Sequence, residues 1–511
     1  MLRVYNTLTK TKEEFKTVEP DKVGMYTCGP TVYKPSHIGH FVGPVIFDAV
    51  KRYLTYSGYT VKWIINITDV DDKLINESKA TGRSVQAIAE EMTADYWTNL
   101  EAMGVKESVF AFPKVSDHIP QIINFITVLI NKGFAYVSDG DVYFDVGAFP
   151  DYGKLSHRSL DAMNGEGGST AAKKHTPFDF ALWKAAKEPD EMAWDSPWGR
   201  GRPGWHIECS VMSSCLLGET FDIHGGGLDL QFPHHENEVA QSEARFGKPM
   251  CHYWMHNGLM QASSETGKLG GRNTKSGDDP YYSANPTADQ EANKISKSKG
   301  ASAFRDMLKI YSPELIRFFI LSTHYRRPID YSEERLAEVG KGLDGFYRFF
   351  KRFEQITGKS FYALTYVSRR GTSPQADGAN NEIIGLKEKF LSFMDDDFNT
   401  GGAVGVQFDL LRELNRLAAD SAAQQDLLSG AAVLRELSAT LGLFIKQQNE
   451  PDCANPADEG LVNNLMTLLI ELRAAARKNK DFATADKIRK DLTTYGITLT
   501  DTPQGTEWNV A

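Results

Sequence analysis

The sequence predicts an α/β protein: a doubly wound parallel-sheet (Rossmann-like) domain with an inserted module, followed by a helical bundle and a small C-terminal α+β domain. Buried strands alternate with amphipathic helices near the N-terminus, which is the pattern of a parallel sheet. Helical periodicity without strands dominates from about residue 342. A chain of 511 residues is also too long for one hydrophobic core, so several domains are expected.

The first half of the sheet domain is expected over residues 1–125. Residues 23–28 form a short apolar strand, and a Gly-Pro pair breaks it before a helix with regularly spaced apolar residues. Gly58 ends that helix, residues 60–67 read as a buried second strand, and another helix begins near Ser84. Nucleotides bind such sheets at the carboxyl ends of the strands.

An inserted module is expected over residues 126–203. Residues 134–146 contain two alternating runs around an Asp139-Gly140 turn, which is a hairpin signal. Glycine, proline, lysine and aromatic residues dominate the rest of the module. The sheet domain then resumes over residues 204–261.

The remaining chain divides into five segments. Residues 262–293 contain few apolar side chains and are expected to form a mobile loop. Ser312-Pro313-Glu314 supplies a cap, a first-turn proline and an acid, which predicts the start of a helix. The other segments are a basic loop with connecting helices at 294–341, a helical bundle at 342–448, a linker at 449–459 and a final domain at 460–511.

Composition excludes several classes of protein. The net charge of -10 excludes a globally basic nucleic-acid coat but leaves room for local basic surfaces. The N-terminus lacks a secretory signal and no apolar run approaches membrane-spanning length, so we expect a cytoplasmic protein without membrane contact. The 5 cysteines are few and odd in number, which argues against a disulfide framework and leaves thiols for a metal.

A first candidate site lies where the first strand meets its helix. Backbone N–H groups and the helix dipole favour anions at such a junction. His37 and His40 can donate hydrogen bonds to phosphate oxygens, and Gly39 leaves room for a nucleotide to approach the backbone. The alternative is that both histidines are capping or surface residues.

A second cluster, Lys294 to Gly300, follows the predicted loop. Its lysines can reach a pyrophosphate, and a mobile loop lets them do so as charge develops during reaction. Taken alone, such a Lys/Ser run is usually a solvated loop.

Four side chains are candidate metal ligands. His234 and Glu238 lie one helical turn apart on the same face, and Cys28 and Cys209 can complete a soft site suited to zinc. None of these pairs is a CxxC motif, and each cysteine alone reads more simply as a buried apolar residue. Competing candidates on the same segment are His235 and Glu236.

The histidine segment at 37–40 and the lysine cluster that begins at Lys294, taken together in this order, resemble the two signatures of class I aminoacyl-tRNA synthetases. They are His37-Ile38-Gly39-His40 and Lys294-Ile295-Ser296-Lys297-Ser298, with isoleucine where methionine is commonest. The resemblance implies that both clusters bind ATP and stabilise the attack of an amino-acid carboxylate on the α-phosphate. The implied catalytic residues are His37, His40, Lys294 and Lys297, and Gly39 and Ser296 are implied to bind ATP with them.

Three further segments, 26–30, 204–209 and 222–238, resemble cysteinyl-tRNA synthetases. In that family the zinc ligands correspond to Cys28, Cys209, His234 and Glu238. The resemblance also implies an amino-acid pocket with Gly29, Thr68, Trp205 and His224, and places Asp229 at the ribose or the ammonium group. Without it, Trp205 reads as core, Asp229 as a turn acid and Thr68 as a strand cap.

The resemblance extends to the C-terminus. Residues 394–400 resemble the family's helical bundle, and segments 483–489 and 496–508 resemble its anticodon-reading domain. A basic helix predicted over 474–491 suits phosphate contacts, although a charge run is usually a solvated face. Trp508 could stack on an unpaired base. One departure is an insertion before the Lys/Ser cluster.

The implied activity is that of a cysteine–tRNA ligase. ATP and L-cysteine give cysteinyl-adenylate and pyrophosphate, and cysteine then passes to the 3′ end of tRNA(Cys). One Zn²⁺ per chain, Mg²⁺ with ATP, and a monomer are expected. A hydrophobic pocket separates close analogues by only about 1–3 kcal/mol, whereas zinc binds a thiolate far better than an alcohol.

Three points stay open. Four protein ligands ordinarily make a closed zinc site, so the substrate must add as a fifth ligand or displace Glu238. One rival function is a ligase that joins cysteine to the amine of a small thiol precursor. Another is a non-catalytic zinc protein that binds RNA.

Overall fold

The computed structural model describes residues 1–158, 173–189, 191–262, 302–365, 370, 380–447, 456–495, 497–502 and 505–510. The chain forms two compact units, Met1–Lys446 and Gln447–Ala511. Most of the predicted loop at 262–293 lies outside the described residues. So does the whole Lys/Ser cluster, including Lys294, Ser296 and Lys297.

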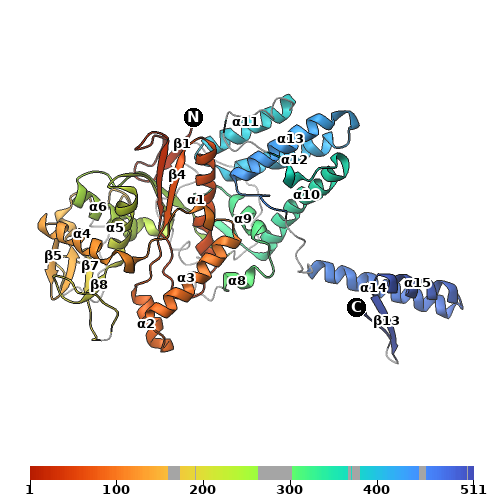
Figure 1. Ribbon diagram of the computed structural model, residues 1–511, viewed down its shortest axis with the longest axis horizontal. Helices are drawn as coiled ribbons and strands as arrows, with labels where there is room; N and C mark the ends of the chain where they lie inside the picture. The colour runs from red at the N-terminus through yellow and green to blue at the C-terminus, as the bar shows by residue number, and fades with distance from the viewer. Residues whose placement is uncertain are drawn as a thin grey trace. The chain divides into compact units, whose positions relative to one another are not determined.

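A four-stranded parallel sheet stands at the centre of the first unit (Figure 1). Its strands are, in spatial order, β10 (Cys251–Asn257), β9 (Phe221–Gly227), β3 (Lys22–Thr27) and β4 (Thr60–Ile65). The chain leaves β3 for β4 on one side and returns much later to β9 on the other side. A topological switch point therefore lies between β3 and β9, where parallel sheets bind ligands.

Six helices connect or cover these strands. They are α1 (Gly39–Tyr56), α2 (Asp72–Thr81), α3 (Val85–Ala102), α4 (Ile119–Asn131), α5 (Trp205–Leu217) and α6 (Glu236–Phe246). The helix predicted after the first strand is α1, and Gly58 follows its last turn with a φ of 107°. The polar helix α2 was not predicted; the Asp71 side chain caps it by accepting the N–H of Lys73.

Side-chain alternation gives the sheet two apolar faces. Met25 and Met255 belong to the core that contains α1, whereas Tyr26 and Trp254 belong to the core that contains α5 and α6. Cys28 follows β3 two positions after Tyr26, and it packs against this second core. The alternation of the first strand thus turns the Cys28 thiol toward α5 and α6.

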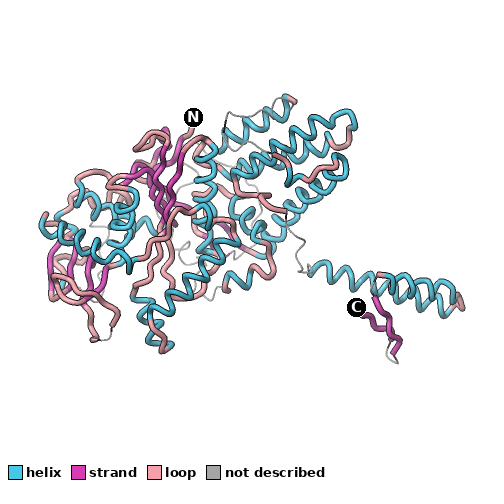
Figure 2. The backbone as a smooth tube through the Cα atoms, viewed as in Figure 1, coloured by secondary structure: helices cyan, strands magenta, loops and turns pink. Residues whose placement is uncertain are grey.

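The inserted module is an antiparallel sheet, visible as a separate group of magenta strands in Figure 2. Its strands are β5 (Ala135–Ser138), β6 (Asp141–Phe144), β7 (Phe180–Ala185) and β8 (Gly201–Pro203). The predicted hairpin turn is present: Asp139 and Gly140 have φ values of 51° and 82°, as a two-residue type I′ turn requires. The boundary expected at 125/126 falls inside α4.

The helical second half of the first unit packs against the face covered by α1. Its main helices are α9 (Pro313–Leu321), α10 (Glu333–Thr357), α11 (Asn381–Asp395), α12 (Thr400–Leu417) and α13 (Gln424–Thr440). Smaller elements of the unit are β1 (Arg3–Asn6), β2 (Thr11–Glu14), β11 (Met260–Ala262), α8 (Phe304–Met307) and β12 (Ile329–Tyr331). The predicted cap is present, since the Ser312 side chain accepts the N–H of Leu315. Within the described part of the chain, none of the helices is both long and apolar enough for a membrane crossing.

The second unit corrects one prediction. It contains α14 (Pro456–Lys478), α15 (Phe482–Thr494) and the hairpin of β13 (Ile497–Thr502) and β14 (Gly505–Val510). The single basic helix expected over 474–491 is wrong, because Lys480 takes a left-handed φ of 60° and Asp481 caps α15. α14 also begins inside the linker expected at 449–459. Trp508 packs against the small core of this unit.

Candidate functional site

Two cysteine sulfurs meet between the sheet and α5. The Sγ atoms of Cys28 and Cys209 lie 3.7 Å apart. His234 lies in the π-helical turn Gln231–His235 that leads into α6, and Glu238 lies in the first turn of α6. Oε1 of Glu238 lies 3.6 Å from the Cys28 sulfur and 3.1 Å from Nε2 of His234. The structure thus brings together the four side chains that were predicted to be metal ligands.

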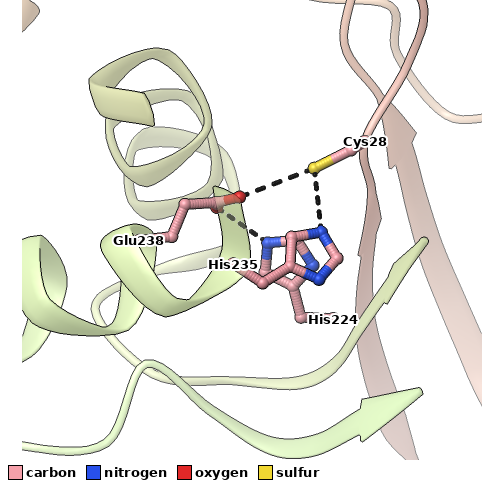
Figure 3. Close-up of side chains that lie close together, drawn as sticks. All are labelled: Cys28, His224, His235 and Glu238. Carbon is pink, nitrogen blue, oxygen red and sulfur yellow. Dashed lines mark hydrogen bonds and ion pairs between the residues drawn. The ribbon is translucent and has the colours of Figure 1, made fainter. Parts of the chain in front are cut away.

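Within the described residues, two groups of four ligand atoms lie inside 4.8 Å of one another. Both contain Cys28 and Glu238; one adds Cys209 and His234, and the other adds two histidines, His224 and His235 (Figure 3). In the second group, Nε2 of His235 lies 3.3 Å from the Cys28 sulfur, and Nε2 of His224 lies 2.9 Å from Oε2 of Glu238.

The distances favour the group with two sulfurs. A tetrahedral zinc ion with ordinary bond lengths separates two sulfurs by about 3.8 Å, sulfur and oxygen by about 3.6 Å, and nitrogen and oxygen by about 3.4 Å. The pairs formed by Cys28 with Cys209, Cys28 with Glu238 and His234 with Glu238 are 3.7, 3.6 and 3.1 Å apart. The 2.9 Å separation of His224 from Glu238 departs further from the tetrahedral value, and the second group contains only one sulfur.

Burial shapes the electrostatics of this cluster. Burial raises the pKa of Cys28 and of Glu238 well above their ordinary values, and it also raises the pKa of Cys209. Burial lowers the pKa of His234 well below its ordinary value, so the imidazole is in the neutral form that binds metals. A divalent cation among these donors would reverse the shifts of the thiols and the carboxyl. The donor set therefore fits zinc.

A second layer of histidines lies behind the cluster. Nδ1 of His206 lies 3.1 Å from Nδ1 of His234, and Nδ1 of His235 lies 2.8 Å from Nε2 of His256. Burial lowers the pKa of both His206 and His256 to about 3, so both rings are neutral at neutral pH. The hydrogen-bonded series from His235 through His256 ends at Thr7, whose Oγ1 lies 2.9 Å from Nδ1 of His256. Neither His206 nor His256 was predicted as a site residue from the sequence.

A cavity of about 350 Å³ opens at the carboxyl ends of the strands. Its lining contains Cys28 and the predicted nucleotide residues His37, Gly39, His40 and Asp229. One pocket therefore contains one member of the candidate ligand group, Cys28, together with residues at the start of α1.

The two signature histidines interact with the backbone at the start of α1. The N–H of Gly39 donates to Nδ1 of His37, and the N–H of His37 donates to Nδ1 of His40, each at 3.1 Å. Because Nδ1 accepts in both rings, the proton of the neutral imidazole is on Nε2, which makes Nε2 a donor. Each histidine can therefore accept a backbone N–H through Nδ1 and still offer Nε2–H to a phosphate, so the two interpretations do not exclude each other.

The predicted amino-acid pocket residues take different places. Gly29 lines the cavity, and the Trp205 ring stacks on His234 with centroids 4.2 Å apart. Trp205 is 39% exposed, so it is not the core residue that its alternative reading required. Thr68 and His224 are buried behind the cavity wall, where they hydrogen-bond Glu208 and Glu238.

Comparison with known proteins matches most of the chain to two family models. Residues 14–269 and 279–341 match the model for the tRNA synthetases class I (C) catalytic domain. Residues 389–445 match the model for the DALR domain.

Two curated relatives are similar over their whole length. The chain is 43% identical over 512 residues to a cysteine–tRNA ligase of Geobacillus thermodenitrificans, covering 99% of this chain and 98% of the relative. It is 42% identical over 520 residues to one of Geobacter sulfurreducens, covering 100% and 99%.

Among solved structures, the fold is similar to that of Mycobacterium tuberculosis methionyl-tRNA synthetase bound by methionyl-adenylate. The TM-score is 0.54 at 12% sequence identity, over 82% of this chain and 90% of that chain. At this identity the likeness shows the shared fold alone. The full-length relatives and the catalytic-domain model go further: the chain belongs to the cysteine–tRNA ligase family of class I aminoacyl-tRNA synthetases.

Proposed function

We propose that this enzyme activates L-cysteine with ATP to cysteinyl-adenylate and then transfers cysteine to the 3′ end of tRNA(Cys). The observation that carries the proposal is one cavity lined by Cys28 and by three residues of the motif His37-Ile38-Gly39-His40, namely His37, Gly39 and His40. The full-length similarity to curated cysteine–tRNA ligases supports the same reaction.

We infer that zinc is held by Cys28, Cys209, His234 and Glu238. When bound, zinc supplies a soft Lewis acid that stabilises the thiolate of cysteine and discriminates against the hydroxyl of serine. His224 holds Oε2 of Glu238, which leaves Oε1 directed at Cys28 and His234. Orienting partners of this kind are typical behind metal ligands.

The nucleotide half of the cavity would act by positioning and by charge. Nε2 of His37 and of His40 would donate hydrogen bonds to phosphate oxygens, and Asp229 would accept one from the ribose or the ammonium group. Lys294 and Lys297 would neutralise the charge that develops on the pyrophosphate, with Ser296 as a further ATP contact and Mg²⁺ accompanying the nucleotide. Positioning and charge neutralisation account for most of the rate in transfers of this kind.

The remaining expectations concern the other partners. In the unit Gln447–Ala511, basic residues lie at the end of α14 (Arg477 and Lys478) and in α15 (Lys487, Arg489 and Lys490), before the hairpin. Such residues suit contacts with the phosphates of tRNA. We propose that this unit, expected from residue 460 onward, binds the anticodon, and that the enzyme is a cytoplasmic monomer.

Two assays on the purified chain test the proposed function. Cysteine-dependent exchange between ATP and pyrophosphate reports activation, and labelled cysteine on a tRNA(Cys) transcript reports transfer. Both should be positive with cysteine and near background with serine. Exchange without tRNA charging would favour the rival ligase that joins cysteine to a small amine, and the absence of exchange would refute an activating enzyme.

A further inference from the structure

Asn66 lies directly after β4 and contacts the segments that carry both cysteines. Its side chain is buried, and Oδ1 accepts the backbone N–H of Gly29 at 2.8 Å. The Cys209 sulfur lies 3.7 Å from the same oxygen, and Nδ2 donates to Oγ1 of Thr68 at 3.2 Å. One amide therefore touches the loop after β3, helix α5 and its own loop.

On the β4 side the strand ladder stops before the Cys28 loop, and the Asn66 amide replaces it there. On the β9 side the N–H of Cys28 donates to the carbonyl of Gly225 at 3.2 Å. The regular pairing of β3 with β4 ends at Thr27 and Ile65. Two residues later, the Asn66 side chain takes the N–H of Gly29, and the N–H of Thr68 donates to the carbonyl of Pro30 at 3.2 Å.

The loop after β3 and the loop after β4 approach each other closely at Gly29 and Asn66. A Cβ on Gly29 would lie 1.7 Å from the main-chain oxygen of Asn66, so only glycine allows the contact. The backbone beside the Cys28 thiol is thus fixed against the loop that follows β4.

On the other side, a short relay reaches the helix of the second cysteine. Oγ1 of Thr68, which accepts from Asn66, donates to Oε2 of Glu208 at 3.0 Å. Glu208 precedes Cys209 in α5, and both residues are 1% exposed. Buried hydrogen bonds of this kind fix the position of the groups that they join, since leaving one unmade is costly.

We propose that Asn66 is a positioning residue that sets the separation of the Cys28 and Cys209 sulfurs, and thereby the affinity of the enzyme for its metal and for cysteine. The proposal rests on the proposed function: the metal readout depends on the zinc site inferred above, and the cysteine readout depends on the proposed reaction. It differs from a purely structural role, because the loss of the amide should act on the thiol site more than on the ATP site.

Cobalt titration of the metal-free full chain measures the first effect, because cobalt bound to thiolates gives a characteristic absorption band. Asn66→Ala should weaken cobalt binding by about 10- to 100-fold, the usual range for residues that orient metal ligands. Asn66→Ser, which keeps a short donor and acceptor, should recover part of the loss. Thr68→Val, which breaks only the relay to α5, should weaken cobalt binding less than Asn66→Ala does.

Exchange kinetics measure the second effect. Asn66→Ala should raise KM for cysteine by a similar factor and leave KM for ATP within about twofold, since the substrate thiol shares the affected site. A matched control is Asn99→Ala: Asn99 is a buried asparagine of α3, and this helix contributes no residue to either ligand group. This control should leave both cobalt affinity and KM for cysteine unchanged.

Two results would overturn the proposal: wild-type cobalt affinity in Asn66→Ala, or equal losses in Asn66→Ala and Asn99→Ala. A failure of the proposed function is separable from these results. In that case the wild-type chain itself would show no cysteine-dependent exchange, whereas the cobalt titrations would still rank the variants.

Discussion

Cys209 contributes one of the two sulfurs of the proposed site. It is buried in α5 and faces Cys28 across 3.7 Å. Serine at this position would keep the size of the side chain but replace a soft thiolate by a hydroxyl, which is a poor zinc ligand.

We therefore expect Cys209→Ser to lose zinc and most of the discrimination between cysteine and serine. Bound zinc per chain should fall from one to near zero in metal analysis, and the cysteine/serine ratio of kcat/KM should fall by at least about 100-fold. Cys251→Ser is the matched control, since Cys251 is buried but belongs to neither ligand group. Full zinc content in Cys209→Ser would contradict the assignment.

The two overlapping ligand groups make opposite predictions for adjacent histidines. His234→Ala should abolish zinc binding because it removes a ligand, whereas His235→Ala should weaken binding by only about 10- to 100-fold because it removes an orienting contact. Competition with a chromogenic chelator measures both affinities. The reverse order would move the ion to the group drawn in Figure 3.

Local signals made several elements predictable, and the exceptions have physical causes. The hairpin at Asp139-Gly140 and the cap at Ser312 depend on neighbouring residues alone, so both could be predicted from the sequence. Helix α2 was missed because it buries only Leu74 and Ile75. The break between α14 and α15 was missed because a lysine, not glycine or proline, takes the left-handed conformation there.

The contact of α2 with the inserted module involves Asp72, which predicts a pH effect. Burial alone would raise the pKa of Asp72, but the hydrogen bonds and charges of Lys184 and Arg202 outweigh it and lower the pKa to about 2. A carboxyl in the unfolded chain titrates near 4. This contact therefore stabilises the fold above about pH 4, and the stabilisation is lost as the pH falls toward 2.

Asp72→Asn should remove that contribution. The side chain of Asp72 is 50% exposed, so solvent screening limits the loss to about 1 kcal/mol or less in the free energy of unfolding at pH 7. Urea unfolding of the wild type and the variant between pH 7 and pH 3 measures the difference, which should shrink below pH 4. A difference that does not depend on pH would show that the charge is irrelevant.

The order of strands in the sheet explains which site residues could be found from the sequence. Cys28 and the signature histidines follow the first strand, so a resemblance to known motifs was enough to find them. His256 and Asn66 become site residues only because β10 and β4 lie on either side of the β9–β3 pair. That arrangement depends on tertiary pairing, which one sequence does not display.

Because the chain forms two compact units, we expect that cysteine activation and tRNA recognition can be separated. Removal of residues 447–511 should leave cysteine-dependent exchange between ATP and pyrophosphate nearly unchanged, because the cluster and the cavity lie in Met1–Lys446. Charging of tRNA(Cys) should fall by at least about tenfold in kcat/KM, as expected for the loss of several phosphate contacts. Undiminished charging would show that the second unit does not contact tRNA.

The central claim, that a metal held by two cysteine sulfurs selects the substrate thiol, is tested most directly by X-ray absorption at the zinc edge of the purified chain. We expect two sulfur ligands at about 2.3 Å, and a third when L-cysteine is added but not when L-serine is added. A single sulfur ligand, or a spectrum that cysteine leaves unchanged, would contradict the account.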